Sequence, residues 1–396
     1  MAGNMNRRMF MSGAMAGTIA VLKPSVVFGT QANSRIELGL IGCGGRGNWI
    51  TNLFNETGKY RFVACADYFE DRVKGTGDRL QIDPKRRHSG LSGYRKLLEE
   101  KLDAVVIETP PFFHPEQASV AVDAGKHVFL AKPIAIDVPG CKSIAESGKR
   151  ATSRKLVFLI DFQTRANEFY REAVRRVHAG DLGRLVMGEA NYPWEGGGRG
   201  GPPASKEERL RNWYYVLQMS GDFIVEQSIH ALDVATWIAG KDPIRAIGTG
   251  GRSLRAEGSI WDHFAVTYWF PDDVVLSFTS IQSIPGVTDE IRCRFFGSEG
   301  VIDTDYFSGV IIRGRKSYKG GRFQELYTTG AQANIETFYQ NITEGRCENE
   351  TVAPSVRSNL TAVLGREAAY RGGEVTWQSL MQSRERLEPD LSGLKS

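Results

Sequence analysis

A glycine-rich turn between a short apolar run and an amphipathic segment constrains this chain more than any other feature. The apolar run is Ile36–Ile41, Gly42, Gly44 and Gly47 follow in the pattern Gly-x-Gly-x-x-Gly, and residues 48–54 have helical periodicity. Glycine at these positions allows a tight turn and a close backbone approach to pyrophosphate, while the helix N-terminus offers N–H groups and a positive dipole end. The pattern predicts the dinucleotide-binding turn of a parallel α/β sheet.

A carboxylate at the end of the next apolar run supports this interpretation. Asp67 follows the run 62–66, about 25 residues after Gly42, where a carboxylate can accept hydrogen bonds from the adenosine ribose. Asp67 would repel a 2′-phosphate, so we expect NAD rather than NADP, although Arg72 could soften that preference. The residues expected to bind the dinucleotide in this part of the chain are Gly42, Gly44, Gly45, Arg46, Gly47, Asp67 and Arg72. The alternative is a tight turn in an α/β domain that binds nothing.

Short apolar runs alternate with helical stretches up to about residue 160. The further runs expected as strands are 104–107, 127–130 and 156–160, and the expected helices are 47–54, 70–80, 92–99, 115–124 and 138–151. Such alternation predicts a parallel sheet with helices on both faces, a Rossmann domain over 33–160.

The pattern changes after a helix expected at 168–179. Residues 264–270 alternate with a period of two, and Pro271 begins a turn into a second strand over 274–280. We therefore expect a C-terminal α+β domain over 161–396 with a large, mainly antiparallel, open-faced sheet, and helix again from residue 335.

The first 32 residues have the composition of an export signal. Arg7 and Arg8 precede Phe10 and an uncharged stretch, 11–22, and Thr30-Gln31-Ala32 is a small-residue cleavage site. We interpret residues 1–32 as a twin-arginine signal peptide and expect a periplasmic or otherwise extracytoplasmic protein that crosses the membrane folded. No later segment approaches the length of apolar sequence that spans a bilayer, so the mature protein is not expected in the membrane.

Charge and cysteine content exclude other classes. The formal net charge is +4, but residues 1–32 contribute three cations and no acid, so the remainder is nearly neutral and nucleic acid is not an expected partner. The cysteines number five, and their spacing fits neither a disulfide framework nor a metal site, so no metal is expected.

Several motifs, taken in order, resemble the Gfo/Idh/MocA oxidoreductases. Besides the glycine turn and Asp67, they are Thr109-Pro110-Pro111-x-x-His114, Gly125-Lys126-His127-Val128, Lys132-Pro133, Gly221-Asp222 and His230-x-x-Asp233. The resemblance covers residues 35 to about 389. It implies a Rossmann domain beside an open-faced α/β domain, and subunits that associate through the open sheet as a homodimer or homotetramer. It also places Thr109, Pro110, His114 and Lys132 at the cofactor, although a water-exposed turn histidine is an alternative for His114.

One departure from the family pattern concerns the proton-transferring residue. The family has Glu-Lys-Pro at the fifth strand, and this chain has Ala131-Lys132-Pro133. The resemblance implies that Lys132 transfers the proton, and chemistry requires burial or a nearby cation to lower its pKa from about 10.4. The alternative is an ordinary ion pair at a strand end. The lost glutamate removes a carboxylate near the nicotinamide end.

Two further groups are candidates for the substrate side. Glu226, His230 and Asp233 would share one face of a helix at spacings of four and three, and we expect them to be catalytic with Lys132. Trp194, Arg211 and Trp213 flank the glycine run 196–201 and suit sugar binding, although a mobile surface loop explains the glycines equally well.

These features favour an exported NAD-dependent oxidoreductase with tightly bound cofactor, acting on a sugar, polyol or glycoside. Tight binding is expected because free dinucleotide is scarce outside the cytoplasm. One alternative is a glycosidase that uses NAD in a transient oxidation–elimination cycle. Another is a non-catalytic ligand-binding protein on the same fold, but loss of Lys132 or His230 would be expected there, and both are present.

Overall fold

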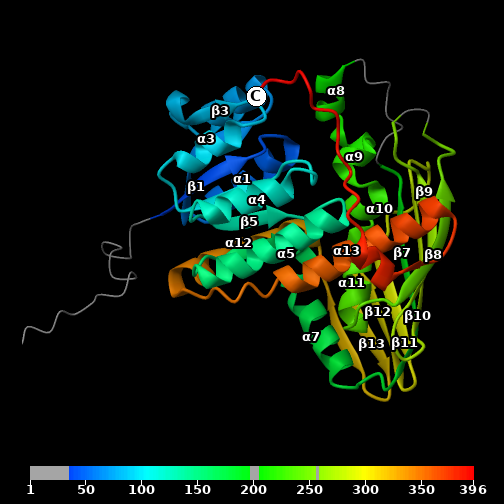
Figure 1. Cartoon of the computed structure of the whole chain (residues 1–396). Coiled ribbons are helices and arrows are strands. Elements are labelled where there is room, and N and C mark those ends of the chain that lie inside the picture. Colours follow the sequence, from blue (N-terminus) through cyan, green and yellow to red (C-terminus); the bar gives the residue numbers. More distant parts are fainter. Residues whose placement is uncertain (1–34, 197–204, 256–257) are drawn as a thin grey trace, which may run out of the picture. The chain divides into compact units, whose positions relative to one another are not determined.

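The apolar runs of the first 160 residues form a six-stranded parallel sheet in the computed structural model of the chain (Figure 1). Its order is β3-β2-β1-β4-β5-β6, so the strand order reverses at β1, next to the glycine turn. The strands are β1 (Ile36–Ile41), β2 (Tyr60–Asp67), β3 (Arg87–Ser89), β4 (Ala104–Ile107), β5 (His127–Ala131) and β6 (Phe158–Asp161). The sequence did not predict β3, a polar edge strand of three residues.

The structure describes residues 35–196, 205–255 and 258–396. The predicted twin-arginine signal and most of the second glycine run lie outside these residues. Residues 36–396 form one compact unit.

Helices cover both faces of the parallel sheet, as predicted. The helices of this half are α1 (Gly45–Glu56), α2 (Glu70–Arg79), α3 (Gly93–Glu99), α4 (His114–Asp123) and α5 (Val138–Ser153). Side chains of α3, α4 and α5 share one apolar cluster with β4, β5 and β6. Side chains of α1 join β1 and β2 in a second cluster, together with α12 (Leu326–Glu344) from the far end of the chain. The predicted boundary between the two domains, after residue 160, stays a prediction.

The second sheet has nine strands in the order β14-β13-β12-β11-β7-β10-β9-β8-β15, and all its pairs are antiparallel except β7 with β10. Its strands are β7 (Leu185–Trp194), β8 (Arg245–Gly251), β9 (His263–Trp269), β10 (Val275–Gln282), β11 (Arg292–Gly297), β12 (Gly300–Asp305), β13 (Gly309–Gly314), β14 (Tyr318–Arg322) and β15 (Val375–Thr376). The predicted hairpin is present, with Trp269 opposite Val275.

One face of the nine-stranded sheet packs on helices, and the other is free of helices within the described part of the chain, as Figure 1 shows. The packed face lies against α7 (Glu168–His178), α10 (Phe223–Glu226), α11 (Ile229–Ala239) and α13 (Val352–Arg371). The predicted fold class, a Rossmann domain with a mainly antiparallel open-faced sheet, is confirmed.

The remaining helices are short. They are α6 (Gln163–Ala166), α8 (Lys206–Arg211), α9 (Leu217–Ser220) and α14 (Trp377–Gln382), with 3₁₀ turns η2 (Pro84–Arg86) and η3 (Trp213–Tyr215). Within the described ranges, no helix has both the length and the apolar character to cross a membrane.

The last residues of the chain return to the parallel sheet. Residues 383–396 run from α14 to the region of β3, drawn red in Figure 1. There the amide of Leu91 donates to the carbonyl of Lys395 at 2.9 Å, and Leu391 and Leu394 pack against a small apolar cluster that contains Phe69. We call residues 389–396 the C-terminal strap.

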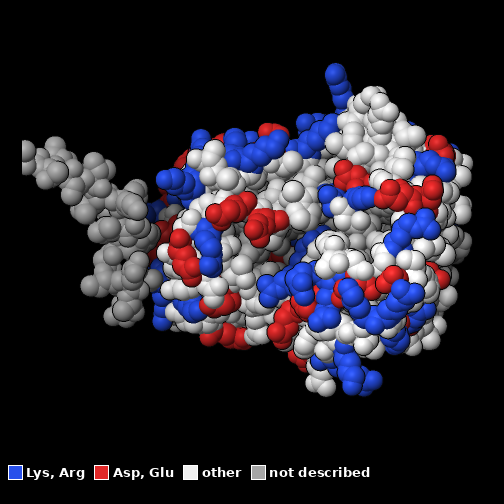
Figure 2. Space-filling view, turned by 90° about the horizontal axis from the view of Figure 1, so that it is seen from below, with Lys and Arg blue, Asp and Glu red and all other residues white. Residues whose placement is uncertain are grey.

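Surface charge is mixed on the face drawn in Figure 2. Basic and acidic side chains lie intermixed there. This agrees with the nearly neutral charge of the chain beyond residue 32.

Candidate functional site

The glycine turn joins the end of β1 to the start of α1 with little space for side chains. Gly42 has a φ of +102°, and a Cβ atom on Gly47 would lie 1.9 Å from the carbonyl oxygen of Gly42. By contrast, a Cβ on Gly45 would meet no atom within 4 Å. No side chain caps the N-terminus of α1 at Gly44, and the first turn of α1 contains no acidic residue. The N–H groups of that turn are therefore suited to bind phosphate.

Asp67 lies at the end of β2, where it supports the turn. Its carboxylate accepts hydrogen bonds from the amide of Cys43 at 2.7 Å and of Phe69 at 2.9 Å. Burial raises the pKa of Asp67, although these two hydrogen bonds oppose the shift. Each carboxylate oxygen accepts more than one hydrogen bond, so Asp67 can still bind ribose hydroxyls.

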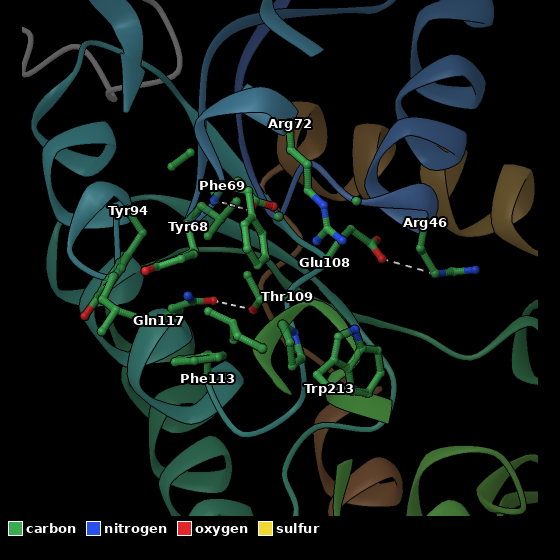
Figure 3. A pocket seen from close by; sticks show the side chains of 18 of the residues that line it. Arg46, Tyr68, Phe69, Arg72, Tyr94, Glu108, Thr109, Phe113, Gln117 and Trp213 are labelled. Atoms are coloured by element: carbon green, nitrogen blue, oxygen red, sulfur yellow. Dashed lines mark hydrogen bonds and ion pairs between the residues drawn. The ribbon is translucent and has the colours of Figure 1, made fainter. Parts of the chain in front are cut away.

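A pocket of about 850 Å³, partly open to solvent, extends from the turn across β2 and β4 (Figure 3). Eight of the predicted cofactor residues line it: Gly42, Gly44, Gly45, Arg46, Asp67, Arg72, Thr109 and Pro110. Figure 3 shows Glu108 and Arg46 at one end and Tyr68 and Tyr94 at the other. Gly47 lies beneath the turn and shapes it from within.

The three predicted sugar-binding residues do not converge. Trp213 lines the pocket beside Phe69 and Arg72. The Arg211 guanidinium lies 4.0 Å from the centre of the Phe69 ring and pairs with Asp71 at 3.2 Å. Trp194 ends β7, and its ring is 6.4 Å from that of Tyr192. Two of the three therefore lie at the nucleotide pocket.

His114 is buried at the start of α4 and is not the exposed turn residue of the alternative interpretation. Its Nδ1 lies 2.8 Å from the carbonyl oxygen of Pro133, and its Nε2 lies 2.7 Å from that of Thr109. Burial lowers its pKa to about 4. His114 thus connects the loops that follow β4 and β5, and its predicted cofactor contact stays a prediction.

Lys132 follows β5 and is bound by a residue of the other half of the chain. Its Nζ donates to the main-chain carbonyl of Glu226 at 2.8 Å and lies 3.5 Å from the Glu226 carboxylate. Only 8% of the lysine side chain and 10% of the glutamate side chain are exposed. Burial lowers the pKa of Lys132, the nearby Arg46 acts in the same direction, and Glu226 opposes them. The shift is in the direction that makes a lysine a better proton acceptor, as its proposed role requires.

The charge of Lys132 acts on the pKa of His230. Burial lowers the pKa of His230 well below its ordinary value, and the charges of Lys132 and Arg46 add to the shift, so the ring is neutral. Its Nδ1 and the Oε2 of Glu226 are buried, and neither finds a hydrogen-bond partner among the described residues. Unpaired buried polar atoms are costly, so this pair is suited to a polar ligand.

The segment that carries these residues is not one helix. Helix α10 ends at Glu226, Gln227 has a φ of −106°, and α11 begins at Ile229. The expected single helical face is therefore wrong, because the chain turns between Glu226 and His230 and the Ser228 hydroxyl bonds to Ser280 at 2.9 Å.

Asp233 is engaged elsewhere. The Arg165 guanidinium binds its carboxylate with contacts of 2.8 to 3.0 Å, and the Ser358 hydroxyl donates to it at 2.6 Å. This ion pair, in which the Asp233 side chain is fully buried and 12% of the Arg165 side chain is exposed, connects α6 to α11 and α13. These contacts give Asp233 a structural role. Among the described residues no hydrogen bond or ion pair joins its carboxylate to Lys132, Glu226 or His230, and its catalytic role stays a prediction.

An ion-pair cluster next to the glycine turn was not predicted. Arg46 Nε lies 3.1 Å from Glu108 Oε2, and its Nη2 lies 2.5 Å from Asp161 Oδ2. Both acids directly end buried strand runs, as Asp67 does, and that shared position is the sequence signal that could have identified them. Arg46 also packs over the stacked rings of Trp49 and Tyr327, so it is held from three sides.

The residues present fit a dinucleotide. The open cradle at Gly45, the uncapped start of α1 and the Asp67 carboxylate supply the contacts that a pyrophosphate and an adenosine ribose require. Among the residues that the structure describes, no group of three or more His, Cys, Asp or Glu side chains could hold a metal ion.

Two family models match the chain, one in each half. Residues 36–159 match "Oxidoreductase family, NAD-binding Rossmann fold", and residues 170–303 match the "GFO/IDH/MocA C-terminal domain".

Two inositol dehydrogenases are similar to more than two thirds of the chain, and a glycosyl hydrolase is similar to a shorter part. Scyllo-inositol 2-dehydrogenase (NAD⁺) of Bacillus subtilis is 24% identical over 274 residues, 68% of this chain and 73% of that protein. Inositol 2-dehydrogenase 2 of Saccharopolyspora erythraea is 28% identical over 308 residues, 75% of this chain and 84% of that protein. A glycosyl hydrolase family 109 protein of Solibacter usitatus is 28% identical over 169 residues, only 41% of this chain and 38% of that protein.

Among solved structures, levoglucosan dehydrogenase in complex with NADH and levoglucosan has the same fold. It superposes with a TM-score of 0.72 at 17% identity, over 87% of this chain and 99% of that chain.

Proposed function

The chain belongs to the Gfo/Idh/MocA family of oxidoreductases, and on that premise we propose that it transfers hydride between NAD(H) and a carbon of a sugar, polyol or glycoside. The inositol and levoglucosan dehydrogenases to which it is similar support this substrate class. The reaction would interconvert a secondary alcohol and a ketone.

The observation that carries the proposal is the buried contact between Lys132 and Glu226. The dinucleotide, when bound, would supply or accept the hydride. In the oxidation direction Lys132 would take the hydroxyl proton, and in the reduction direction it would return it. The unpaired Nδ1 of the neutral His230 and the Oε2 of Glu226 would orient the hydroxyl through hydrogen bonds.

We propose that the cofactor is NAD and that it stays bound through many turnovers. Asp67 at the adenosine end supports NAD over NADP. The C-terminal strap supports retention, because it packs on the residues that form the wall of the pocket near Phe69 and Leu91. A bound cofactor that cannot exchange requires a second substrate to take the hydride back, or a reaction that is redox-neutral overall.

We also propose an extracytoplasmic location and a homo-oligomeric state. Arg7, Arg8 and the uncharged stretch after them support export by the twin-arginine route. The face of the nine-stranded sheet without helices exposes 38% of Met187 and 44% of Ile247, and such a face is suited to association with a second copy.

The proposal is tested with purified protein that received no added cofactor. Mass spectrometry after denaturation should detect NAD(H). A panel of inositols, aldoses, anhydrosugars and glycosides should contain a compound that changes the near-ultraviolet absorbance of the bound nicotinamide. Protein that binds no NAD(H) and oxidises or reduces none of these compounds would contradict it.

The similarity to the family 109 protein favours a second candidate, a glycosidase with a transient oxidation step. The two candidates differ in net redox change. A glycosidase would cleave a nitrophenyl glycoside over many turnovers without accumulating NADH, whereas a dehydrogenase would stop after one turnover unless a hydride acceptor is added.

A further inference from the structure

Three strand ends of the parallel sheet place a row of positions side by side. Ile107 of β4 pairs with Leu130 of β5, and Ala131 of β5 pairs with Asp161 of β6. Glu108 directly follows Ile107 at the end of β4, and continuing the same register places it beside Ala131, which directly follows Leu130. Positions in register on parallel strands direct their side chains to the same face, so Glu108, Ala131 and Asp161 form one row.

Arg46 spans this row from the glycine turn. Its guanidinium contacts Glu108 and Asp161, the two outer members. The middle member, Ala131, has a single methyl group, which leaves room for the guanidinium between the two carboxylates. The alanine that departs from the family pattern thus lies next to a carboxylate supplied by the neighbouring strand.

The surroundings of Glu108 are those of a ligand-binding group. Its side chain is completely buried and lines the nucleotide pocket, and one oxygen is paired with Arg46. The other oxygen, Oε1, is buried and finds no hydrogen-bond partner among the described residues. Burial raises the pKa of this carboxyl to about 7, so the protein keeps an acid where its charge is costly.

The order of the strands indicates which part of a ligand would reach Glu108. Asp67 ends β2 on one side of β1, and Glu108 follows β4 on the other side. A dinucleotide whose pyrophosphate lies on the glycine turn and whose adenosine ribose reaches Asp67 must extend its nicotinamide half over β4. The hydrogen-bond donors that half carries next to the pyrophosphate are the hydroxyls of its ribose.

We propose that Glu108 supplies from β4 the carboxylate that Ala131 removes from β5, and that its Oε1 accepts a hydrogen bond from the ribose hydroxyls on the nicotinamide side of the bound dinucleotide. This inference rests on the proposed function, because it requires that the pocket bind NAD(H). It makes Glu108 a cofactor-binding residue, and it makes Arg46 and Asp161 the residues that position it.

The test compares three ligands of increasing length by calorimetry. ADP reaches only the turn and Asp67, ADP-ribose adds the second ribose, and NADH adds the nicotinamide. Glu108→Leu, which keeps the volume but cannot accept a hydrogen bond, should weaken ADP-ribose and NADH by about tenfold to a hundredfold, the usual effect of losing a charge-assisted hydrogen bond. ADP should bind within about twofold of the parent, since it does not reach Glu108. Glu99→Leu, at an exposed acid of α3, is the matched control.

A double variant tests whether a carboxylate at position 131, after β5, can replace the one at position 108, after β4. Glu108→Ala should weaken ADP-ribose binding, and Glu108→Ala with Ala131→Glu should recover at least about a third of the lost free energy. No recovery would contradict the assignment of Glu108 as the substitute for the family glutamate.

The outcomes separate this inference from the proposed function. If the parent protein binds none of the three ligands, the proposed function fails. If the parent binds NADH and Glu108→Leu binds all three ligands equally well, the inference alone fails. Equal weakening of ADP and NADH would also overturn it, because Glu108 would then act through the shape of the glycine turn.

Discussion

The Nζ atom of Lys132 lies 2.8 Å from the main-chain carbonyl oxygen of Glu226, across the contact between the parallel sheet and α10. This hydrogen bond and a longer contact of 3.5 Å between Nζ and the Glu226 carboxylate hold the lysine at the carboxyl end of β5. The other carboxylate oxygen of Glu226, Oε2, has no hydrogen-bond partner among the described residues and is left for a substrate.

Substitution of either Lys132 or His230 by alanine should lower kcat by about 10²- to 10⁴-fold, the usual contribution of general acid–base catalysis. The Kd for NADH should change little, because neither side chain lines the pocket at the glycine turn. Steady-state kinetics and calorimetry would measure the two effects, with exposed Lys149→Ala as control. Full activity of Lys132→Ala would refute its role as the base, and loss of cofactor binding would assign it to binding instead.

The raised pKa of Glu108 predicts how stability depends on pH. An unfolded glutamate has a pKa near 4.5, and in the folded apo-protein the pKa is about 7. Between these values the folded state holds a proton that the unfolded state releases, so the Glu108 contribution to the free energy of unfolding falls as pH rises through this window.

Glu108→Gln should remove this contribution. Relative to the parent, the variant should gain up to about 3 kcal/mol of unfolding free energy at pH 8 and nothing at pH 4.5. Urea denaturation of the apo-protein at several pH values would measure the difference, and Glu99→Gln serves as control. A difference that is the same at every pH would show that Glu108 keeps an ordinary pKa.

Most of the parallel sheet could be predicted from the sequence, because the patterns that indicate its strands are local. Buried parallel strands are short apolar runs, and Gly42 and Gly47 have conformations or contacts that only glycine tolerates. The strand β3 was missed because Arg87 and Ser89 are polar and the strand has only three residues.

The site was predicted less completely because its contacts join distant parts of the chain. Lys132 meets Glu226 only after the second half folds against the first. Arg211 and Trp213 suited a sugar in the sequence, but α8 and η3 place them beside Phe69 at the nucleotide pocket. The Asp233 carboxylate pairs with Arg165, whose position no local pattern indicates.

Asp67 should make the protein prefer NAD(H). The Kd for NADPH should exceed that for NADH by at least about tenfold, since the partly buried Asp67 carboxylate repels the 2′-phosphate. Asp67→Asn removes the negative charge and should lower the ratio of the Kd for NADPH to the Kd for NADH. Adding Arg72→Ala should raise this ratio again, because Arg72 is the cation that lines the same pocket. Equal affinities in the parent protein would contradict the assignment.

Arg7→Lys together with Arg8→Lys should trap the precursor in the cytoplasm, because the twin-arginine pathway reads the pair as arginines. Fractionation followed by immunoblotting would locate the protein. Activity of the trapped precursor should equal that of the parent, since all the residues proposed for cofactor binding and catalysis lie within 36–396. Continued export of the double variant would refute the signal assignment.

The C-terminal strap should govern how long the cofactor stays bound. Leu391 and Leu394 pack on the cluster around Phe69, and Lys395 bonds to Leu91, so the strap supports two residues that line the pocket. Both leucine side chains are partly exposed, so replacing each by alanine should remove apolar contacts that contribute about 1 to 2 kcal/mol. The dissociation rate of NADH should then rise by about tenfold to a hundredfold, while its association rate changes little.

Stopped-flow displacement of NADH, followed by nicotinamide fluorescence, would measure both rates. Leu387→Ala is the matched control, because that leucine precedes the strap and lies near Asp137 and Val138 instead. For retention at nanomolar free cofactor the parent protein needs a Kd near or below nanomolar, roughly −12 kcal/mol. A parent that releases NADH within seconds and binds it only at micromolar concentration would contradict the proposed retention, and an unchanged rate in the double leucine variant would show that the strap has no part in it.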